Sequence, residues 1–303
     1  MENISTVLSM ASLDQNFINK TFSIICDDPG GANLIFELIK KKKIKSSYFH
    51  LSRTAKKTNS FFKKIKNTSI KTIINKSENI VIGSSSNFEF KILKLCTKNK
   101  KNILLINDHW NKKWSLSFFE KSKKIISPTT EIWCVSNSIY LKLKKIIKNA
   151  KIKLIKNPIL EKINSLKKKN FCENNILYLS EPTHKSNRYD ASACLNYFLN
   201  NISYIQGNLN KIIIRPHPKE NLKKIKNIKK KFPKLKIIIR SKNNIFEEIM
   251  NSKYVAGCNT VPMYYALYSK KKVFCAINKN NIKSGILDHE NNKLIYLREL
   301  LKQ

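Results

Sequence analysis

The feature that most constrains the fold of this chain is a recurring pair of segments. A short apolar run rich in Ile, Val and Phe is followed by turn residues and then by a longer, lysine-flanked stretch with helical spacing. Continuous apolar runs are typical of strands buried on both faces, as in parallel sheets covered by helices. We therefore predict an α/β chain of doubly wound parallel sheets. The predicted strands are 21–26, 47–51, 70–74, 79–82, 102–106, 131–135, 175–179, 210–215, 236–240, 253–256 and 272–277, and the predicted helices are 32–43, 87–97, 137–148, 189–200, 220–231, 244–250 and 261–269.

The chain is long enough for two domains. It has 303 residues, and domains of about 150 residues are common. A strand-like run at 153–155 is followed by Asn157-Pro158, a chain-breaking pair, and then by a lysine-rich segment. We predict two Rossmann-like domains, 1–156 and 157–303, in a GT-B-like arrangement with a cleft between them. Such a cleft is where we expect a ligand.

The charge of the chain is strongly positive. Lysine and arginine number 59 against 20 acidic residues, and only five of the 59 are arginine. Lysine, isoleucine and asparagine are all abundant, and AT-rich codons encode all three, so compositional bias accounts for the charge; the alternative is a selected polyanion-binding surface. No basic patch alternates regularly with stacking aromatics, so a specific nucleic-acid partner is not expected.

The cysteine pattern predicts neither a metal site nor disulfides. The seven cysteines lie far apart, without a C-x-x-C pair or histidines at metal-ligand spacing, and several fall in apolar runs. Buried reduced thiols fit a cytoplasmic protein. Residues 1–20 lack the pattern of a secretory signal, and no apolar run reaches the roughly 18 residues of a membrane span. We expect a cytoplasmic protein whose lysine-rich surface suits peripheral contact with an anionic membrane.

Polar residues directly after predicted strands carry most weight, because ligands of parallel α/β folds bind at the carboxyl ends of strands. The first such segment, Asp-Asp-Pro-Gly-Gly-Ala-Asn at 27–33, opens a predicted helix and holds two of the six glycines. Exposed amides at a helix start suit an anion or a closely approaching sugar, whereas the simpler alternative is a turn with acidic residues that favour the helix dipole. The candidate substrate-binding residues are Asp27, Gly30, Gly31 and Asn33, and the Asp27-Asp28 pair is a reserve catalytic base.

Two further strand ends follow in the first half. In Gly-Ser-Ser-Ser-Asn-Phe-Glu at 83–89, Ser86 and Glu89 fit a capping box, while Ser84 and Ser85 are candidates to bind a substrate hydroxyl or phosphate. After the strand at 102–106 comes Asn107-Asp108-His109-Trp110. We predict Asp108 as general base beside the His109 imidazole, and Trp110 as an aromatic platform for a sugar ring. The alternative is a loop aspartate that caps the next segment, with Trp110 in the core.

The most specific motif is Arg215-Pro216-His217-Pro218, which ends a strongly apolar strand. The prolines fix the loop and so present the side chains of Arg215 and His217 rigidly. An arginine binds phosphate oxygens in a bidentate fork, and a histidine can donate a hydrogen bond to phosphate. We therefore predict a phosphate-binding loop at this strand end.

The last strand end, Gly-Cys-Asn-Thr-Val-Pro at 257–262, has the pattern of a helix start. Asn259 and Thr260 stand at N-cap positions and Pro262 falls in the first turn. A helix that begins here would offer backbone amides to an anion, so Gly257, Asn259 and Thr260 join the predicted phosphate site. Capping alone is the alternative explanation for Asn259 and Thr260.

The second half resembles the donor-nucleotide domain of GT-B-fold glycosyltransferases and their relatives. The segments that carry the resemblance are Ile-Leu-Tyr-Leu-Ser-Glu-Pro at 176–182, Arg-Pro-His-Pro-Lys-Glu at 215–220 and Gly-Cys-Asn-Thr at 257–260, leading into Tyr-Tyr-Ala-Leu at 264–267. In bacterial polysialyltransferases, sialyltransferases and CDP-glycerol glycerophosphotransferases, a His-Pro pair in this context binds the donor phosphate and a Ser or Thr at the later helix start assists it. The resemblance thus implicates His217 and Thr260, with Asn259 beside it, and Glu181 is a further substrate-binding candidate. Sialyltransferase-like groups also place an acidic base at a strand end of the first domain; Asn107-Asp108-His109 resembles that position but lacks their acidic-acidic-Gly pattern.

These observations predict a metal-independent glycosyltransferase. It would move a sugar from a nucleotide-activated donor, used as a substrate rather than a cofactor, to a surface-glycan or lipid-linked acceptor. Asp108 would take the acceptor proton, while Arg215, His217 and the helix start at Thr260 stabilise the leaving phosphate. The sequence has no D-x-D motif, in agreement with a reaction that uses no metal. Three alternatives stay open: a glycerophosphotransferase, a nonhydrolysing UDP-sugar epimerase with the same fold and a His-Pro loop, and a nonenzymatic polyanion-binding protein.

Overall fold

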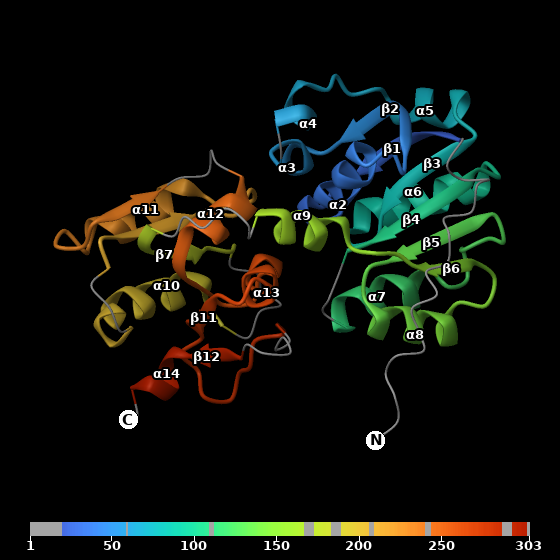
Figure 1. The fold of residues 1–303 in the computed structure, drawn as a ribbon. Coiled ribbons are helices and arrows are strands. Elements are labelled where there is room, and N and C mark those ends of the chain that lie inside the picture. The colour runs from blue at the N-terminus through green and yellow to red at the C-terminus, as the bar shows by residue number, and fades with distance from the viewer. Residues whose placement is uncertain are drawn as a thin grey trace. The chain divides into compact units, whose positions relative to one another are not determined.

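The computed structural model of the chain describes residues 20–58, 60–108, 112–166, 173–182, 189–205, 209–239, 244–286 and 293–301. Two compact units are present (Figure 1). The first contains the described residues up to 108 and residues 115–156, and the second contains residues 112–114 and the described residues from 157 onward. Within the described ranges, no helix is both long and apolar enough to cross a bilayer.

The first unit is built on a six-stranded sheet in the order β2-β1-β3-β4-β5-β6, with every pairing parallel. Residues at the same height form an apolar row across four strands, Ile25, Ile82, Leu105 and Ile132, and all are fully buried. The direction in which strands are added reverses between β1 and β3, which makes a topological switch point. The strands are β1 (Thr21–Cys26), β2 (Lys45–Leu51), β3 (Asn79–Gly83), β4 (Asn102–Asn107), β5 (Thr130–Cys134) and β6 (Lys151–Leu154).

The described helices of the first unit fill the connections between its parallel strands. They are α2 (Pro29–Lys40), α3 (Arg53–Lys56), α4 (Ser60–Lys64), α5 (Ile70–Lys76), α6 (Asn87–Lys98), α7 (Lys112–Ser122) and α8 (Asn137–Ile146). The strand predicted at 70–74 is wrong, since these residues begin α5. The Ser69 side chain caps the helix by accepting a hydrogen bond from the Thr72 amide, and Ile73 and Ile74 are buried one turn after Ile70.

The second unit is built on another six-stranded parallel sheet, in the order β12-β11-β10-β7-β8-β9. Its switch point lies between β7 and β10. At the carboxyl end of β7, Leu179 pairs with Arg215 of β8 on one side and with Gly257 of β10 on the other. The strands are β7 (Glu173–Leu179), β8 (Lys211–Arg215), β9 (Ile237–Ile239), β10 (Ser252–Gly257), β11 (Lys272–Cys275) and β12 (Leu294–Tyr296).

Helices cover both faces of the second sheet. The described ones are α9 (Pro158–Leu166), α10 (Ala191–Asn200), α11 (Leu222–Lys230), α12 (Ile245–Asn251), α13 (Val261–Tyr268) and α14 (Leu297–Leu300), with a short 3₁₀ turn at Ile202–Tyr204. Helices α10 and α11 pack over Tyr178 and Ile214 on one face. On the other face α9 packs against α12 and α13, and Asn164 donates a hydrogen bond to the Tyr268 hydroxyl over 2.9 Å. Two doubly wound, Rossmann-like domains were the predicted fold class, and this prediction is confirmed.

Candidate functional site

Three strand ends of the second sheet meet at its switch point, which is where doubly wound folds bind ligands. Ser180 and Glu181 follow β7, His217 lies just after β8, and Asn259 and Thr260 follow β10. We call these residues, together with Glu220, the strand-end site of the second unit. The site brings together Glu181, His217, Asn259 and Thr260, which the sequence had singled out from three separate segments.

His217 is held in place by the carboxylate of Glu220. Glu220 accepts a hydrogen bond from the Ser180 hydroxyl over 2.6 Å and another from the His217 amide over 3.0 Å, so it ties the loop after β8 to the end of β7. Burial raises the pKa of Glu220, against the effect of these two hydrogen bonds. The Nδ1 atom of His217 accepts a hydrogen bond from the Lys219 amide over 3.1 Å. The neutral ring therefore carries its proton on Nε2, which makes Nε2 a donor.

Arg215 makes an ion pair with Glu248 of α12. Its Nη1 lies 2.5 Å from Oε2 of Glu248, a residue of α12 that is only 2% exposed. One end of the guanidinium thus neutralises a buried carboxylate, a partner that the sequence pattern did not reveal. The role of Arg215 as a phosphate ligand stays a prediction.

The turn from β10 into α13 is closely packed at Gly257. A Cβ atom there would lie 3.0 Å from the Leu179 carbonyl oxygen and 3.0 Å from the Met263 sulfur, so a side chain would force these neighbours to move by a few tenths of an ångström. Thr260 is the N-cap residue of α13, but its side chain makes no capping hydrogen bond. Asn259 is occupied elsewhere, since its Oδ1 accepts a hydrogen bond from the Gly285 amide over 2.8 Å. Capping therefore does not account for these two side chains.

Glu181 lies against the same turn. Its Oε1 accepts a hydrogen bond from the Tyr189 hydroxyl over 2.6 Å, and its carboxyl group also receives the Asn259 amide and the Cys258 thiol. Burial raises the pKa of Glu181 to about 7, and the nearby Glu220 carboxylate acts in the same direction. A carboxyl group whose pKa is raised by burial therefore stands beside the start of α13.

Glu89 organises the switch point of the first sheet. It is fully buried. Its Oε1 accepts the amides of Asp27 (3.0 Å) and Asp28 (3.3 Å), and its Oε2 accepts the amides of Ser85 (2.9 Å) and Ser86 (3.0 Å). The predicted capping box is confirmed, because the Glu89 amide also donates to Ser86 Oγ. The capping pattern indicated Glu89, but it did not indicate the contacts with Asp27 and Asp28, which follow β1 and lie 62 and 61 residues earlier in the chain.

Asp28 and Asp108 flank the start of α2. Asp28 is the N-cap residue, and its Oδ2 accepts the amides of Gly30 over 2.8 Å and Gly31 over 3.3 Å. Asp28 therefore has a structural role at the start of α2, as the simpler alternative of a turn with acidic residues near the positive end of the helix dipole implies. The Asp108 carboxylate, 2% exposed, lies over Gly30, where a Cβ would come within 2.0 Å of Asp108 Oδ2. The fold thus brings the ends of β1 and β4 together at this point.

The other candidates of the first unit fall into three groups. Ser84 is buried, donates to the Ile106 carbonyl over 3.0 Å and accepts from the Asn107 side chain over 3.2 Å, which are structural contacts. Asn33 lies on α2 and is partly buried. His109 and Trp110 lie outside the described residues, so their predicted roles stay predictions. Within the described ranges, no three His, Cys, Asp or Glu side chains gather as metal ligands would.

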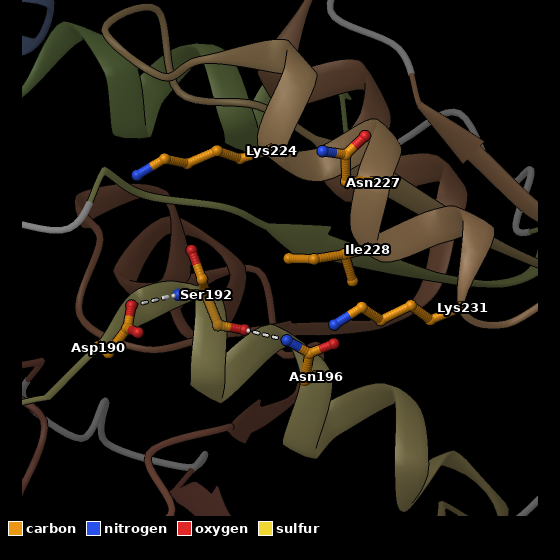
Figure 2. Close-up of a pocket in the computed structure, with 7 residues that line it drawn as sticks. All are labelled: Asp190, Ser192, Asn196, Lys224, Asn227, Ile228 and Lys231. Carbon is orange, nitrogen blue, oxygen red and sulfur yellow. Dashed lines mark hydrogen bonds between the residues drawn. The ribbon is translucent and has the colours of Figure 1, made fainter.

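A groove of about 420 Å³ lies between α10 and α11 (Figure 2). Polar side chains at the start of α10 face Lys224 of α11 and Lys231, its C-cap residue, across the groove, and the Asp190 side chain accepts a hydrogen bond from the Ser192 amide. The groove is lined by Asp190, Ser192, Asn196, Lys224, Asn227, Ile228 and Lys231. None of these residues belongs to the strand-end site.

Comparison with known proteins identifies the fold. No family model and no curated protein matches the sequence. Among solved structures, the chain is similar to the UDP-GlcNAc 2-epimerase of Methanocaldococcus jannaschii in complex with UDP-GlcNAc and UDP (15% identity, 93% of this chain and 91% of that chain, TM-score 0.60). It is also similar to S. aureus MnaA with UDP (12% identity, 86% and 80%, TM-score 0.57) and to the wall teichoic acid polymerase TagF (10% identity, 92% and 78%, TM-score 0.50). At these identities the likeness establishes the fold, which is GT-B-like as predicted.

Proposed function

We propose that the protein is an enzyme that acts on a nucleotide-activated sugar and holds the phosphates of the nucleotide in the strand-end site of the second unit. The observation that carries this proposal is the meeting of two anion-binding elements at the switch point of the second sheet. One is the His217 loop, with Nε2 as donor; the other is the start of α13, whose N-cap hydroxyl on Thr260 is not used for capping.

Both elements suit phosphate for physical reasons. The start of a helix carries partial positive charge and directs backbone amides toward an anion. The Pro-His-Pro loop is fixed by Glu220, so His217 needs no reorganisation to donate a hydrogen bond. Solved structures of similar fold hold UDP-GlcNAc and UDP, UDP alone, or CDPG, and this supports a nucleotide as the ligand.

For the reaction, we propose transfer of the sugar to a surface-glycan or lipid-linked acceptor, without a metal. His217 and the start of α13 would stabilise negative charge on the departing nucleotide phosphate. Asp108 is the proposed base for the acceptor hydroxyl, on the ground that its carboxylate stands at a strand end over Gly30. The absence of a D-x-D motif from the sequence supports a metal-independent reaction.

A second candidate function is epimerisation at C2 of a UDP-sugar. The likeness to a UDP-GlcNAc 2-epimerase over 93% of this chain, with a TM-score of 0.60, favours it. Epimerisation needs no acceptor, whereas transfer does, and this difference separates the two functions experimentally.

The test is to incubate the protein with UDP-GlcNAc, CMP-sialic acid and CDP-glycerol and to follow each by proton NMR. A transferase releases free nucleotide, slowly with water as acceptor and faster with added glycan or lipid extract, and Asp108→Asn slows this release. An epimerase instead forms a new UDP-sugar without releasing UDP. Release of CMP from CDP-glycerol alone would identify a glycerophosphotransferase. If no donor is consumed, and no nucleotide binds saturably at high salt, the proposal is wrong.

A further inference from the structure

The carboxyl group of Glu181 faces the turn that begins α13. It contacts three donors: the Tyr189 hydroxyl at 2.6 Å, the Asn259 amide and the Cys258 thiol. The Asn259 contact places the carboxyl group beside the start of α13, to which the proposed function assigns the nucleotide phosphate. Glu181 therefore lies next to the proposed phosphate position.

An ionised Glu181 would oppose a bound phosphate. Two negative charges a few ångströms apart repel strongly in a partly desolvated site. Glu220, whose carboxylate holds the neighbouring His217 loop, adds further negative charge. The arrangement becomes favourable if Glu181 carries a proton, because a carboxylic acid donates a hydrogen bond to phosphate instead of repelling it.

We propose that Glu181 binds the nucleotide phosphate as a neutral carboxylic acid, so that binding takes up one proton from solution. This inference rests on the proposed function. Oε1 accepts the Tyr189 hydrogen bond, which places the added proton on Oε2, where it is donated to a phosphate oxygen. No covalent bond of the ligand breaks in this step, and the proton comes from the solvent.

Among the described residues, the titratable groups that interact with Glu181 are hydroxyl, thiol and carboxyl groups. They are Tyr178 of β7, Tyr189 before α10, Cys194 of α10, Glu220 after β8, Cys258 after β10 and Cys275 of β11. The guanidinium of Arg298 on α14, near Cys275, donates to the carbonyls of residues 277, 279 and 282. His217 and Glu220 are further titratable groups of the site, and the experiment must separate their contributions.

The direction of the pH effect follows from the free state. Burial raises the pKa of Glu181 to about 7, so the neutral form is already well populated in neutral solution. Binding of phosphate to the neutral form raises this pKa further. Affinity is then greatest below pH 7 and falls as the pH rises through 7, with a limit of about tenfold per pH unit.

The test is calorimetry with UDP-GlcNAc, whose pyrophosphate diester stays fully ionised between pH 5 and 9. Titrations at pH 8.0 in two buffers of different ionisation enthalpy give the number of protons taken up on binding. For wild type we expect a net uptake that approaches one proton, because Glu181 is mostly ionised at pH 8 before the ligand binds. Glu181→Gln should bind with about that much less uptake and with a flatter pH dependence. His217 is present in both proteins, so the difference between them reports Glu181.

Tyr189→Phe provides a second variant, in case Glu181→Gln does not fold. It removes the 2.6 Å hydrogen bond that favours the carboxylate, so the midpoint of the pH dependence should move upward and binding at pH 8 should tighten. Equal proton uptake by wild type and Glu181→Gln, or an unmoved midpoint in Tyr189→Phe, overturns the inference even if UDP-GlcNAc binds and His217→Ala weakens binding. Failure of UDP-GlcNAc, CMP-sialic acid and CDP-glycerol to bind at all contradicts the proposed function instead, and the inference with it.

Discussion

Replacing Gly83 by alanine should destabilise the first unit strongly. Gly83 ends β3, and a Cβ atom there would lie 2.1 Å from Oε1 of Glu89 and 2.7 Å from its Cδ. Contacts this short require one group to move. Glu89 is buried and bound at both carboxylate oxygens to amides of two separate loops, so it cannot turn aside without breaking those bonds.

The magnitude follows from the bonds at stake. A hydrogen bond to a charged group contributes about 1.5–3 kcal/mol to the free energy of unfolding. When a buried carboxylate loses such partners, its desolvation is no longer offset, which lowers stability further. If two of the four amide contacts of Glu89 are lost, the free energy of unfolding should fall by about 3–5 kcal/mol. Gly31→Ala is the matched control. Its Cβ would lie 3.5 Å from the Cys26 sulfur, an ordinary contact, and alanine is favoured over glycine within a helix by up to about 1 kcal/mol.

The assay is urea unfolding followed by circular dichroism and by tryptophan fluorescence, because Trp133 is buried in the first sheet. Gly83→Ala should lower the free energy of unfolding, whereas Gly31→Ala should leave it unchanged or raise it. In a Glu89→Ala background the space is free, so Gly83→Ala should cost much less, a coupling that a double-mutant cycle measures. Equal small effects at both glycines, or an undiminished cost in the Glu89→Ala background, would refute the role given to Glu89.

Three further predictions concern the charged groups of the two units. Arg215→Ala should lower the free energy of unfolding by about 3–5 kcal/mol, because it leaves buried Glu248 without its 2.5 Å ion pair; the double variant with Glu248→Gln should recover part of this loss in urea melts, and no recovery would contradict the pairing. Glu181→Gln should stabilise the protein with a pH dependence of defined sign. The folded-state pKa of about 7 lies above the ordinary 4.5, so the wild type loses stability as pH rises from 4.5 to 7, and the variant should gain up to about 3 kcal/mol at pH 8 but little at pH 4; a gain of equal size at both pH values speaks against the raised pKa. Asp28→Ala should cost about 1 kcal/mol through loss of the α2 cap, and Asp28→Asn should retain most of that stability in the same melts.

The fold was predictable because its strands are continuous apolar runs separated by clear turn signals. Strand β1 has the predicted bounds, and β3, β4, β7 and β8 differ from them by two residues or fewer. The strand predicted at 70–74 is wrong for a local reason. Adjacent Ile73 and Ile74 are typical of a strand, whereas the spacing from Ile70 and the cap by Ser69 favour the helix that forms. Short elements such as α3 and α14 have four residues each, too few for a periodic pattern to emerge.

The candidate site was predictable only where its chemistry is local in sequence. The Pro-His-Pro loop and the start of α13 show themselves within a few residues. The partners that decide the electrostatics are distant: Glu248 lies 33 residues from Arg215, Glu220 lies 40 from Ser180, and Glu89 lies 62 from Asp27. No residue pattern joins such pairs, because only the parallel register of the strands brings them together.

Calorimetric titration of CMP, CDP, UDP, GDP and ADP into wild type and His217→Ala at two salt concentrations shows whether the His217 loop holds a nucleotide phosphate. The high net positive charge of +39 makes the salt comparison essential, since nonspecific anion binding disappears as salt rises. The account predicts saturable binding of one nucleotide class that survives high salt and is lost or strongly weakened in His217→Ala. Equal binding of all five nucleotides that vanishes with salt and does not respond to the substitution would contradict it.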